Sequence, residues 1–325
     1  MKITVCIPTF NSEVYIRDCI ESVLAQQDVE FEIVVSDNAS EDNTWNILQS
    51  FSDPRIRCFR SDENRGMACN FNRALQEARG EYVNLLCSDD LLEPNALRVA
   101  SRFLDEHPEV AMATCARHLI DANNGVLGTV RWFSQPVILG ALNLRAVSLV
   151  HGNVVGEPSA VLFRRDAWLE AGPFQEGRGT LIDLDMWLRL SRQGDIGYLP
   201  APLCRIRRHA LSMTNEFRKA GTAQEADLYV TVALLRELHA GWLVQTVSFG
   251  KVAGSYLRNA LYGFKCGFIK GPLSLLGKAL KLDPAFIGLF LYLALFRPGL
   301  LGLRMGHSGK PTVCAASTLR CVPEI

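Results

Sequence analysis

Two adjacent carboxylates, Asp89 and Asp90, stand directly after an apolar run at residues 83–87. Such a run is typical of a buried strand, and Glu93-Pro94 just beyond it favours the start of a helix. Acids at the carboxyl end of a central strand lie where open α/β sheets bind their ligands. Placed there, the two side chains can hold a divalent cation against phosphate oxygens. A turn with two solvated aspartates is the alternative interpretation, which this segment alone leaves open.

Polar residues also follow the other strands expected near the N-terminus. Pro8 and Thr9 form a turn that can lay backbone groups and a hydroxyl along a planar base, and Asp37 could accept an N–H from a nucleobase. Asn64 precedes Gly66 at a helix entrance, where the backbone can approach phosphate closely. Plain βα turns and Asx-turns explain the same residues, so each segment is a weak signal by itself.

Two further acids and a histidine come later in the chain. Asp183 and Asp185 open a helix expected over 183–192, and on a helix they point in different directions. One of them could act as a general base toward a hydroxyl group, which contributes roughly 10²–10⁴ in rate. Acids in a first helical turn are also common as partners of the helix dipole. His209 could bind a metal through neutral imidazole or lie on the surface.

The elements that must position these residues alternate between strand and helix over residues 2–115. We expect strands at 3–7, 31–36, 55–60, 81–87 and 110–115. We expect one helix capped by Ser12 and further helices at 42–51, 67–78 and 94–107. Alternation of this kind implies parallel strands joined by right-handed crossovers. Beyond residue 117 the pattern is mixed, with strands expected at 159–164 and 203–207.

The chain divides into three parts by composition. We predict an α/β domain over residues 1–214, a helical extension over 215–306 and a poorly ordered tail over 307–325. The region from residue 250 onward carries ten Lys or Arg and two acids, so it is strongly basic while the remainder is acidic. Basic and apolar residues interleave over 265–296, which suggests a helix lying in a membrane interface. Ordinary docking of helices on the α/β domain is the alternative.

Composition excludes several classes of protein. The 325 residues carry no formal net charge, which argues against a general nucleic-acid binder. The ten cysteines lack C-x-x-C spacing, so we expect small buried hydrophobes in a reducing compartment. The first strand begins almost at Met1 and the longest apolar run, 285–296, is too short to span a bilayer, so we expect a cytoplasmic protein. A Walker-type loop and a G-x-G-x-x-G motif are both lacking, which counts against P-loop and dinucleotide enzymes.

Six segments, taken in order, resemble the family 2 inverting glycosyltransferases, which have the GT-A nucleotide-sugar fold. The resemblance covers roughly residues 2–214 and is specific only as a combination. The segments are Pro8–Asn11, Asp37–Thr44, Asn64–Arg73, Cys87–Asp90, Leu181–Leu190 and Cys204–Thr214. The resemblance implies a Rossmann-like, mostly parallel sheet flanked by helices, with the helical C-terminal extension added to it.

On the donor side, the resemblance implies that Thr9, with Pro8, and Asp37 bind the nucleotide base. Asn64, in the third segment, is counted with them as a donor-binding residue. Asp89 would lie near the ribose or the sugar of a nucleoside-diphosphate sugar.

The resemblance also implies a divalent metal, Mn²⁺ or Mg²⁺, bound by Asp90 with His209 as a possible further ligand. Cys87 occupies the place of the first acid in the family's D-x-D-D element, which weakens the case for a tightly held metal. Asp183 matches the second residue of the family's E-D signature and is the expected catalytic base, with Asp185 as the fallback. The segment 156–159 matches the region that lines the sugar and acceptor site.

The implied function is inverting transfer of a sugar to a hydroxyl of a glycan or lipid-linked acceptor, in bacterial surface polysaccharide synthesis. We expect a cytoplasmic enzyme, in possible peripheral contact with the membrane, and no nucleic-acid partner. A non-catalytic nucleotide-sugar-binding scaffold is one alternative, although retention of Asp89, Asp90 and Asp183 argues against it. A nucleotidyltransferase is another, but it should carry a Gly-rich basic loop where Pro8 and Thr9 stand.

Overall fold

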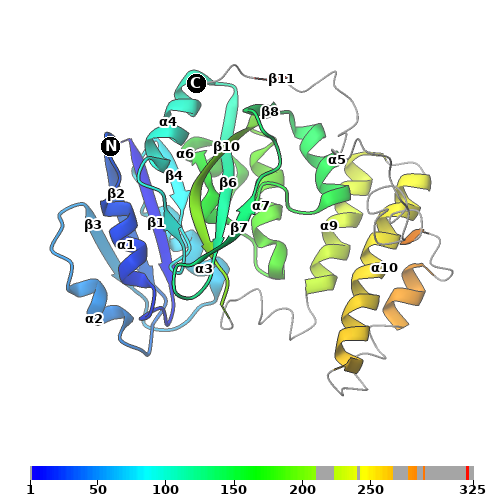
Figure 1. The fold of residues 1–325 in the computed structure, drawn as a ribbon, viewed down its shortest axis with the longest axis horizontal. Coiled ribbons are helices and arrows are strands. Elements are labelled where there is room, and N and C mark those ends of the chain that lie inside the picture. Colours follow the sequence, from blue (N-terminus) through cyan, green and yellow to red (C-terminus); the bar gives the residue numbers. More distant parts are fainter. Residues whose placement is uncertain are drawn as a thin grey trace.

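A mixed, mostly parallel sheet forms the centre of the molecule, with its strands in the order β11-β8-β10-β6-β9-β4-β1-β2-β3 (Figure 1). The structure is a computed structural model that describes residues 2–209, 223–239, 242–265, 277–283, 288–289 and 320–321. Two short strands lie off the main path, where β5 pairs with β10 and β7 pairs with β6. The strands are β1 (Ile3–Thr9), β2 (Phe31–Asp37), β3 (Ile56–Arg60), β4 (Tyr82–Leu85), β5 (Leu91–Leu92), β6 (Val110–Ile120), β7 (Val126–Val130), β8 (Val137–Leu139), β9 (Val161–Arg164), β10 (Asp195–Arg207) and β11 (Arg320–Cys321).

Helices cover both faces of this sheet. The helices are α1 (Ile16–Leu24), α2 (Thr44–Gln49), α3 (Met67–Gln76), α4 (Ala96–Glu106), α5 (Ala141–His151), α6 (Arg165–Ala171), α7 (Ile182–Leu190), α9 (Ala223–Glu237) and α10 (Trp242–Lys265), with 3₁₀ turns η1 (Pro158–Ala160) and η2 (Gly179–Leu181). One core cluster joins α1, α2 and α4 to one face, and a second joins α3, α6 and α7 to the other. Alternate residues of β1 enter the two clusters, since Val5 belongs to the first and Cys6 to the second. The expected α/β fold class is therefore confirmed.

The sheet is mostly parallel, as expected, but one antiparallel strand lies at a place that matters for the site. β9 lies between β4 and β6 and runs antiparallel to both of them. Its first residue therefore lies at the edge of the sheet where the parallel strands β1, β2 and β4 end. The segment that leads into β9 consequently reaches the same edge as the residues that follow β4.

Two boundary predictions near this edge are wrong. The helix expected from Pro94 begins at Ala96, because Leu91–Leu92 form β5 and pair with β10, and a turn at residues 94–95 separates this strand from the helix. Ser12 does not cap α1 with its side chain; its hydroxyl lies 2.8 Å from that of Ser88 and also donates to the carbonyl of Phe10. Ser12 thus connects the turn after β1 to the residue before Asp89.

The helical extension packs beside α5 and α7 (Figure 1). Leu234 and Val230 of α9 share an apolar cluster with Leu184 of α7, and buried Arg145 of α5 pairs with Glu237 at 2.5 Å. Within the described residues, no helix has the length and apolar character needed to cross a membrane. Most of the predicted interfacial segment 265–296 and of the predicted disordered tail 307–325 lies outside the described residues. The seven cysteines within residues 2–209 are free thiols.

Candidate active site

The first group of expected site residues lies where β1 and β2 end side by side. Thr9 and Asp37 are paired in register across these parallel strands, so their side chains share one face of the sheet. Oδ1 of Asp37 accepts from the backbone N and the hydroxyl of Ser40, at 3.1 and 2.5 Å. Oδ2 of Asp37, 3.3 Å from Nε of Arg60, and Oγ1 of Thr9 are buried and have no hydrogen-bond partner in the part of the chain that the structure describes. Polar atoms with such unused capacity suit a base that offers N–H and C=O groups.

Pro8 and Asn64 take part in the framework around these two residues. Pro8 is a buried residue of β1 itself, directly before Thr9. Asn64 is exposed, and its Oδ1 accepts from Asn38 Nδ2 at 2.7 Å and from the N–H of Gly66 at 2.9 Å. Gly66 has φ +83°, a conformation that favours glycine at this helix entrance. A hollow of about 700 Å³ opens beside this turn, lined in part by Arg60, Arg65 and the face of α3.

The adjacent acids after β4 lie in different surroundings. Asp90 is almost fully buried, and its oxygens accept from Oγ of Ser159 at 2.6 Å and from the backbone N of Arg207 at 2.8 Å. Burial and the neighbouring charge of Asp89 raise the pKa of Asp90 well above its ordinary value. The side chain of Asp89 is 28% exposed, and its Oδ2 lies 2.9 Å from Nε2 of His209. Asp89 is therefore the member of the pair whose carboxylate can reach a ligand.

The chemistry of this cluster fits a hard divalent cation. Donor atoms of Cys87, Asp89 and Asp90 lie within 4.8 Å of one another. Mg²⁺ and Mn²⁺ favour carboxylate oxygens over thiols, so the acids are the better ligands and Cys87 the poorer one. His209, in contact with Asp89, adds a nitrogen at the same place.

One short segment contacts both this acid pair and the expected catalytic base; we name residues 153–159 the bridging loop. At its start, Nδ2 of Asn153 donates to Oδ2 of Asp183 at 2.8 Å. At its end, the hydroxyl of Ser159 donates to Asp90 at 2.6 Å. The antiparallel direction of β9 explains why this loop reaches the carboxyl edge of the sheet. Acids that lie 93 positions apart in the sequence are thereby brought to a common loop.

Glu157, in the middle of the bridging loop, couples the same acids electrostatically. Its oxygens lie 2.7 Å from Nε of buried Arg117 and 2.6 Å from Nη2 of Arg208. Burial alone would raise the pKa of Glu157, but the two guanidinium groups hold it below its ordinary value. The charge of Glu157 acts on both Asp90 and Asp183 and helps to raise the pKa of each. The three carboxyls therefore share one electrostatic environment.

Asp183 has the properties of a general base. It lies in the first turn of α7, half-buried, and its Oδ1 accepts from the N–H of Leu184 at 2.7 Å. Burial raises its pKa to about 7 and the charge of Glu157 adds to this, against the opposing effects of the Leu184 N–H and of Arg117. A carboxyl that titrates near neutral pH is matched to proton transfer at that pH.

Asp185, the fallback base, is committed elsewhere. Its oxygens pair with Arg178 at 3.2 Å and with Arg189, one helical turn later, at 3.0 Å. The pair with Arg178 ties the start of α7 to the residue before η2, and the pair with Arg189 lies within α7. The geometry thus favours Asp183 over Asp185.

Sequence reasoning missed two residues of this site. Arg117 lies inside β6 and is buried against Glu157, and no local pattern distinguishes it from an ordinary strand residue. Asn153 likewise carries no local signal, since the carboxyl that it contacts, Asp183, lies 30 positions later in the chain.

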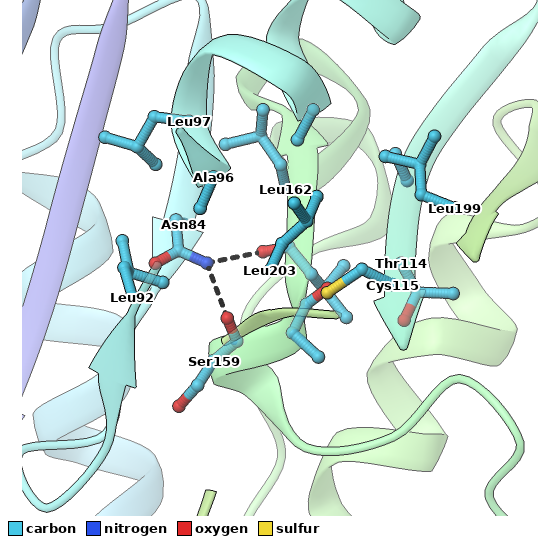
Figure 2. A pocket seen from close by; sticks show the side chains of 14 residues that line it. Asn84, Leu92, Ala96, Leu97, Thr114, Cys115, Ser159, Leu162, Leu199 and Leu203 are labelled. Carbon is cyan, nitrogen blue, oxygen red and sulfur yellow. Dashed lines mark hydrogen bonds between the residues drawn. The ribbon is translucent and has the colours of Figure 1, made fainter. Parts of the chain in front are cut away.

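A second, much smaller cavity lies behind the bridging loop (Figure 2). Its volume of about 20 Å³ is that of a single water molecule, too small for a nucleotide or a sugar. Figure 2 shows the amide of Asn84, which donates to the carbonyl oxygens of Ser159 at 3.2 Å and of Val161 at 2.9 Å. This cavity therefore belongs to the support of the loop and not to the substrate site.

Sequence comparison agrees with this geometry. The profile of glycosyl transferase family 2 matches residues 4–167, half of the chain. The chain belongs to glycosyl transferase family 2. The matched range includes the ends of β1, β2 and β4 and the whole bridging loop, and it ends before Asp183. Asp37, Asp89 and Asp90 therefore lie in the part of this glycosyltransferase that matches the family, whereas Asp183 lies outside it.

Curated relatives extend the likeness. An uncharacterized protein of Mycobacterium tuberculosis is 34% identical over 224 residues, which are 64% of this chain and 67% of that protein. Chondroitin synthase of Escherichia coli is 30% identical over 203 residues, 61% of this chain but only 27% of the synthase. The putative glycosyltransferase EpsE of Bacillus subtilis is 27% identical over 205 residues, 61% of this chain and 69% of EpsE. The glycosyltransferase thus spans about a quarter of the chondroitin synthase that it matches.

Solved structures show the same fold. Residues 1–349 of TarS from S. aureus, crystallised with UDP-GlcNAc, match with a TM-score of 0.59 and 20% identity over 87% of this chain and 93% of TarS. The mannosyltransferase PcManGT from Pyrobaculum calidifontis, in complex with GDP-Man and Mn²⁺, matches with a TM-score of 0.54 and 18% identity, over 90% and 84% of the two chains. These likenesses establish the GT-A fold.

Proposed function

We propose that this glycosyltransferase is a metal-dependent, inverting enzyme that moves a sugar from a nucleoside-diphosphate sugar to a hydroxyl of a glycan or lipid-linked acceptor. The bridging loop carries the proposal, because it contacts the acid pair suited to a cation at one end and a carboxyl suited to proton transfer at the other. In the proposed transfer, one group would stabilise the leaving diphosphate and the other would accept the proton of the attacking hydroxyl.

The donor's base is assigned to the edge formed by Thr9 and Asp37, with Pro8 and the Asn64 turn as its walls. The Thr9 hydroxyl, which makes no hydrogen bond to the described residues, and Oδ2 of Asp37, which pairs with Arg60 without a hydrogen bond, support this assignment. The complexes of TarS with UDP-GlcNAc and of PcManGT with GDP-Man, which share the fold, support a nucleotide sugar as the donor class.

The cation is assigned to Asp89 and His209, with Asp90 behind them. Asp90 was the metal ligand expected from the resemblance, but its two oxygens already accept hydrogen bonds from Ser159 and Arg207. We infer that Asp90 supports the site from within, while Asp89 is open to the cation. When bound, Mn²⁺ or Mg²⁺ supplies a Lewis acid for the negative charge that develops on the leaving diphosphate.

Proton transfer is assigned to Asp183. Its ionised carboxylate accepts the proton of the acceptor hydroxyl as that oxygen attacks the anomeric carbon. The bond from that carbon to the nucleoside diphosphate breaks in the same step, and inversion at the carbon follows from attack opposite the leaving group. Because the pKa of Asp183 is about 7, a large fraction of the enzyme holds the ionised form at neutral pH.

The setting proposed for this reaction is bacterial surface polysaccharide synthesis. Relatives named chondroitin synthase and EpsE support a glycan product. Contact of the basic C-terminal region with an anionic membrane, beside a lipid-linked acceptor, remains a prediction from its charge.

Substitution of Asp183 by asparagine tests the base directly. Asp183→Asn is expected to abolish transfer while the dissociation constant of the donor, measured by calorimetry with Mn²⁺, stays within about threefold of wild type. Asp185→Asn, two residues along the same helix, is the matched control and should retain transfer. NMR of the product's anomeric centre tests inversion.

Each rival has its own outcome in these assays. Donor binding with neither nucleotide release nor transfer would indicate a scaffold, and pyrophosphate release from a nucleoside triphosphate would indicate a nucleotidyltransferase. Near-wild-type transfer by Asp183→Asn would remove the base from this position.

A further inference from the structure

The side chain of Asn153 is fully committed between the bridging loop and Asp183. Its Oδ1 accepts from the N–H of Gly156 at 2.9 Å, and its Nδ2 donates both to the carbonyl of Gly156 at 3.1 Å and to Oδ2 of Asp183 at 2.8 Å. The opposite orientation of the amide would set its oxygen against a carbonyl and a carboxylate. The hydrogen bonds therefore fix which end of the amide faces Asp183.

The loop that presents Asn153 is itself held from two sides. Gly156 has φ +102°, and a Cβ there would lie 2.6 Å from the guanidinium of Arg117, so only glycine fits. The carbonyl of Gly156 also accepts from Nε1 of Trp187 at 3.0 Å. Trp187 is fully buried and lies one helical turn after Asp183 on α7. Loop and helix are thus joined at two points one turn apart.

We propose that Asn153 is a positioning residue that orients the carboxylate of Asp183 for proton transfer and favours its ionised form. This inference rests on the proposed function of Asp183 as the base. An N–H that donates to a carboxylate stabilises its charged state, and here it acts on the oxygen that the backbone of Leu184 does not reach.

The charged groups around Asp183 make the hydrogen bond from Asn153 important. Burial and Glu157, in the bridging loop, both disfavour the ionised carboxylate, and Arg117, from β6, favours it. Removal of the Asn153 donor leaves Arg117 and the backbone N–H groups of Leu184 and of Asp183 itself to oppose burial. The base should then be protonated over a wider pH range and transfer should require more alkaline solution.

The test is the pH dependence of kcat for Asn153→Asp, which preserves shape but replaces the donor with a carboxylate. The midpoint of the acid limb is expected to rise by about 1–3 pH units, and kcat at pH 7 to fall about fivefold or more, with donor KM unchanged. Asn153→Ala, which removes the donor without adding charge, should shift the midpoint in the same direction by a smaller amount.

Asn72→Asp is a matched control. Asn72, on α3, holds another loop in the same two-ended way, because its amide donates to the carbonyl of Phe174 at 2.9 Å and accepts from the N–H of Phe174 at 2.7 Å. These hydrogen bonds are to Phe174 and not to Asp183, so their loss should leave the midpoint where it is. A general structural effect of an Asn→Asp change would shift both variants alike.

The outcomes distinguish a failure of the role of Asn153 from a failure of the proposed role of Asp183 as the base. Loss of transfer in Asp183→Asn together with a wild-type midpoint in Asn153→Asp overturns the role of Asn153 alone. Retained transfer in Asp183→Asn overturns the base and, with it, this inference. If circular dichroism shows that Asn153→Asp does not fold, the pH dependence of kcat for Asn153→Ala is the deciding measurement. A midpoint equal to that of wild type in Asn153→Ala refutes the proposal.

Discussion

Substitution of Asp183 by asparagine should stabilise the fold above neutral pH although it stops transfer. Burial raises the pKa of this carboxyl from 3.8 to about 7, so the folded protein binds the proton more tightly than the unfolded chain does. Above pH 7, folding must keep an ionised carboxylate where its surroundings disfavour the charge. An asparagine has no charge to bury and can still accept a hydrogen bond from Asn153 or Leu184.

The size and sign of the effect follow from the shift in pKa. A shift of about 3 units, at 1.36 kcal/mol for each, sets an upper limit of about 4 kcal/mol. Because the side chain is half-buried, solvent screening reduces this, and we expect a gain of about 2–4 kcal/mol. Below about pH 4 both states hold the proton and no gain arises; between about pH 4 and 7 wild type loses stability relative to the variant, and above pH 7 the difference is constant.

Thermal unfolding of the two proteins from pH 4 to pH 8.5, without donor or metal, measures this difference. The variant should melt close to wild type at pH 4 and roughly 4–16 °C above it at pH 8, since 1 kcal/mol corresponds to roughly 2–4 °C for a domain of this size. Asp185→Asn is the control and should lower Tm near neutral pH, because it breaks ion pairs with Arg178 and Arg189. A difference between Asp183→Asn and wild type that does not change with pH would refute the reasoning.

Three further predictions concern the proposed metal site, the bridging loop and the site proposed for the nucleotide base. Asp89→Asn should raise the Mn²⁺ concentration for half-maximal transfer about tenfold or more, and an unchanged metal requirement would move the cation away from Asp89. Gly156→Ala should lower the free energy of unfolding by about 2–4 kcal/mol in urea, through its positive φ and its clash with Arg117, whereas Gly128→Ala, with open space around it, should have little effect. Thr9→Val should weaken nucleoside-diphosphate binding about fivefold in calorimetry without loss of Tm, because the Thr9 hydroxyl makes no hydrogen bond to the described part of the chain; unchanged affinity would remove Thr9 from the donor site.

Local sequence patterns predict much of this fold and the places where its site residues lie. The strands β1 to β4 and their helices follow the expected alternation, and Thr9, Asp37 and Asp89 stand at or just after strand ends as predicted. These features depend on residues close together in the chain, where periodicity and turn chemistry act directly.

The remaining features depend on contacts between distant residues. The antiparallel pairing of β9 with β4 joins residues about 80 positions apart, and no local pattern fixes the direction of such a strand. The difference between Asp89 and Asp90 likewise arises from Ser159, 69 positions later, and from Arg207, 117 positions later. Asn153 could not be singled out, because its role exists only once α7 has packed against the loop.

The length of the bridging loop also restricts how enzymes of this kind can diversify. An insertion within residues 153–159 would alter the spacing between Asp183 and Asp90, on which the proposed mechanism depends, so a lengthened loop should impair turnover. Residues 172–179, between α6 and η2, contact neither group and line the larger hollow at Phe174. Chains of this type that act on glycans of different size should therefore differ in length at 172–179 and agree in length at 153–159.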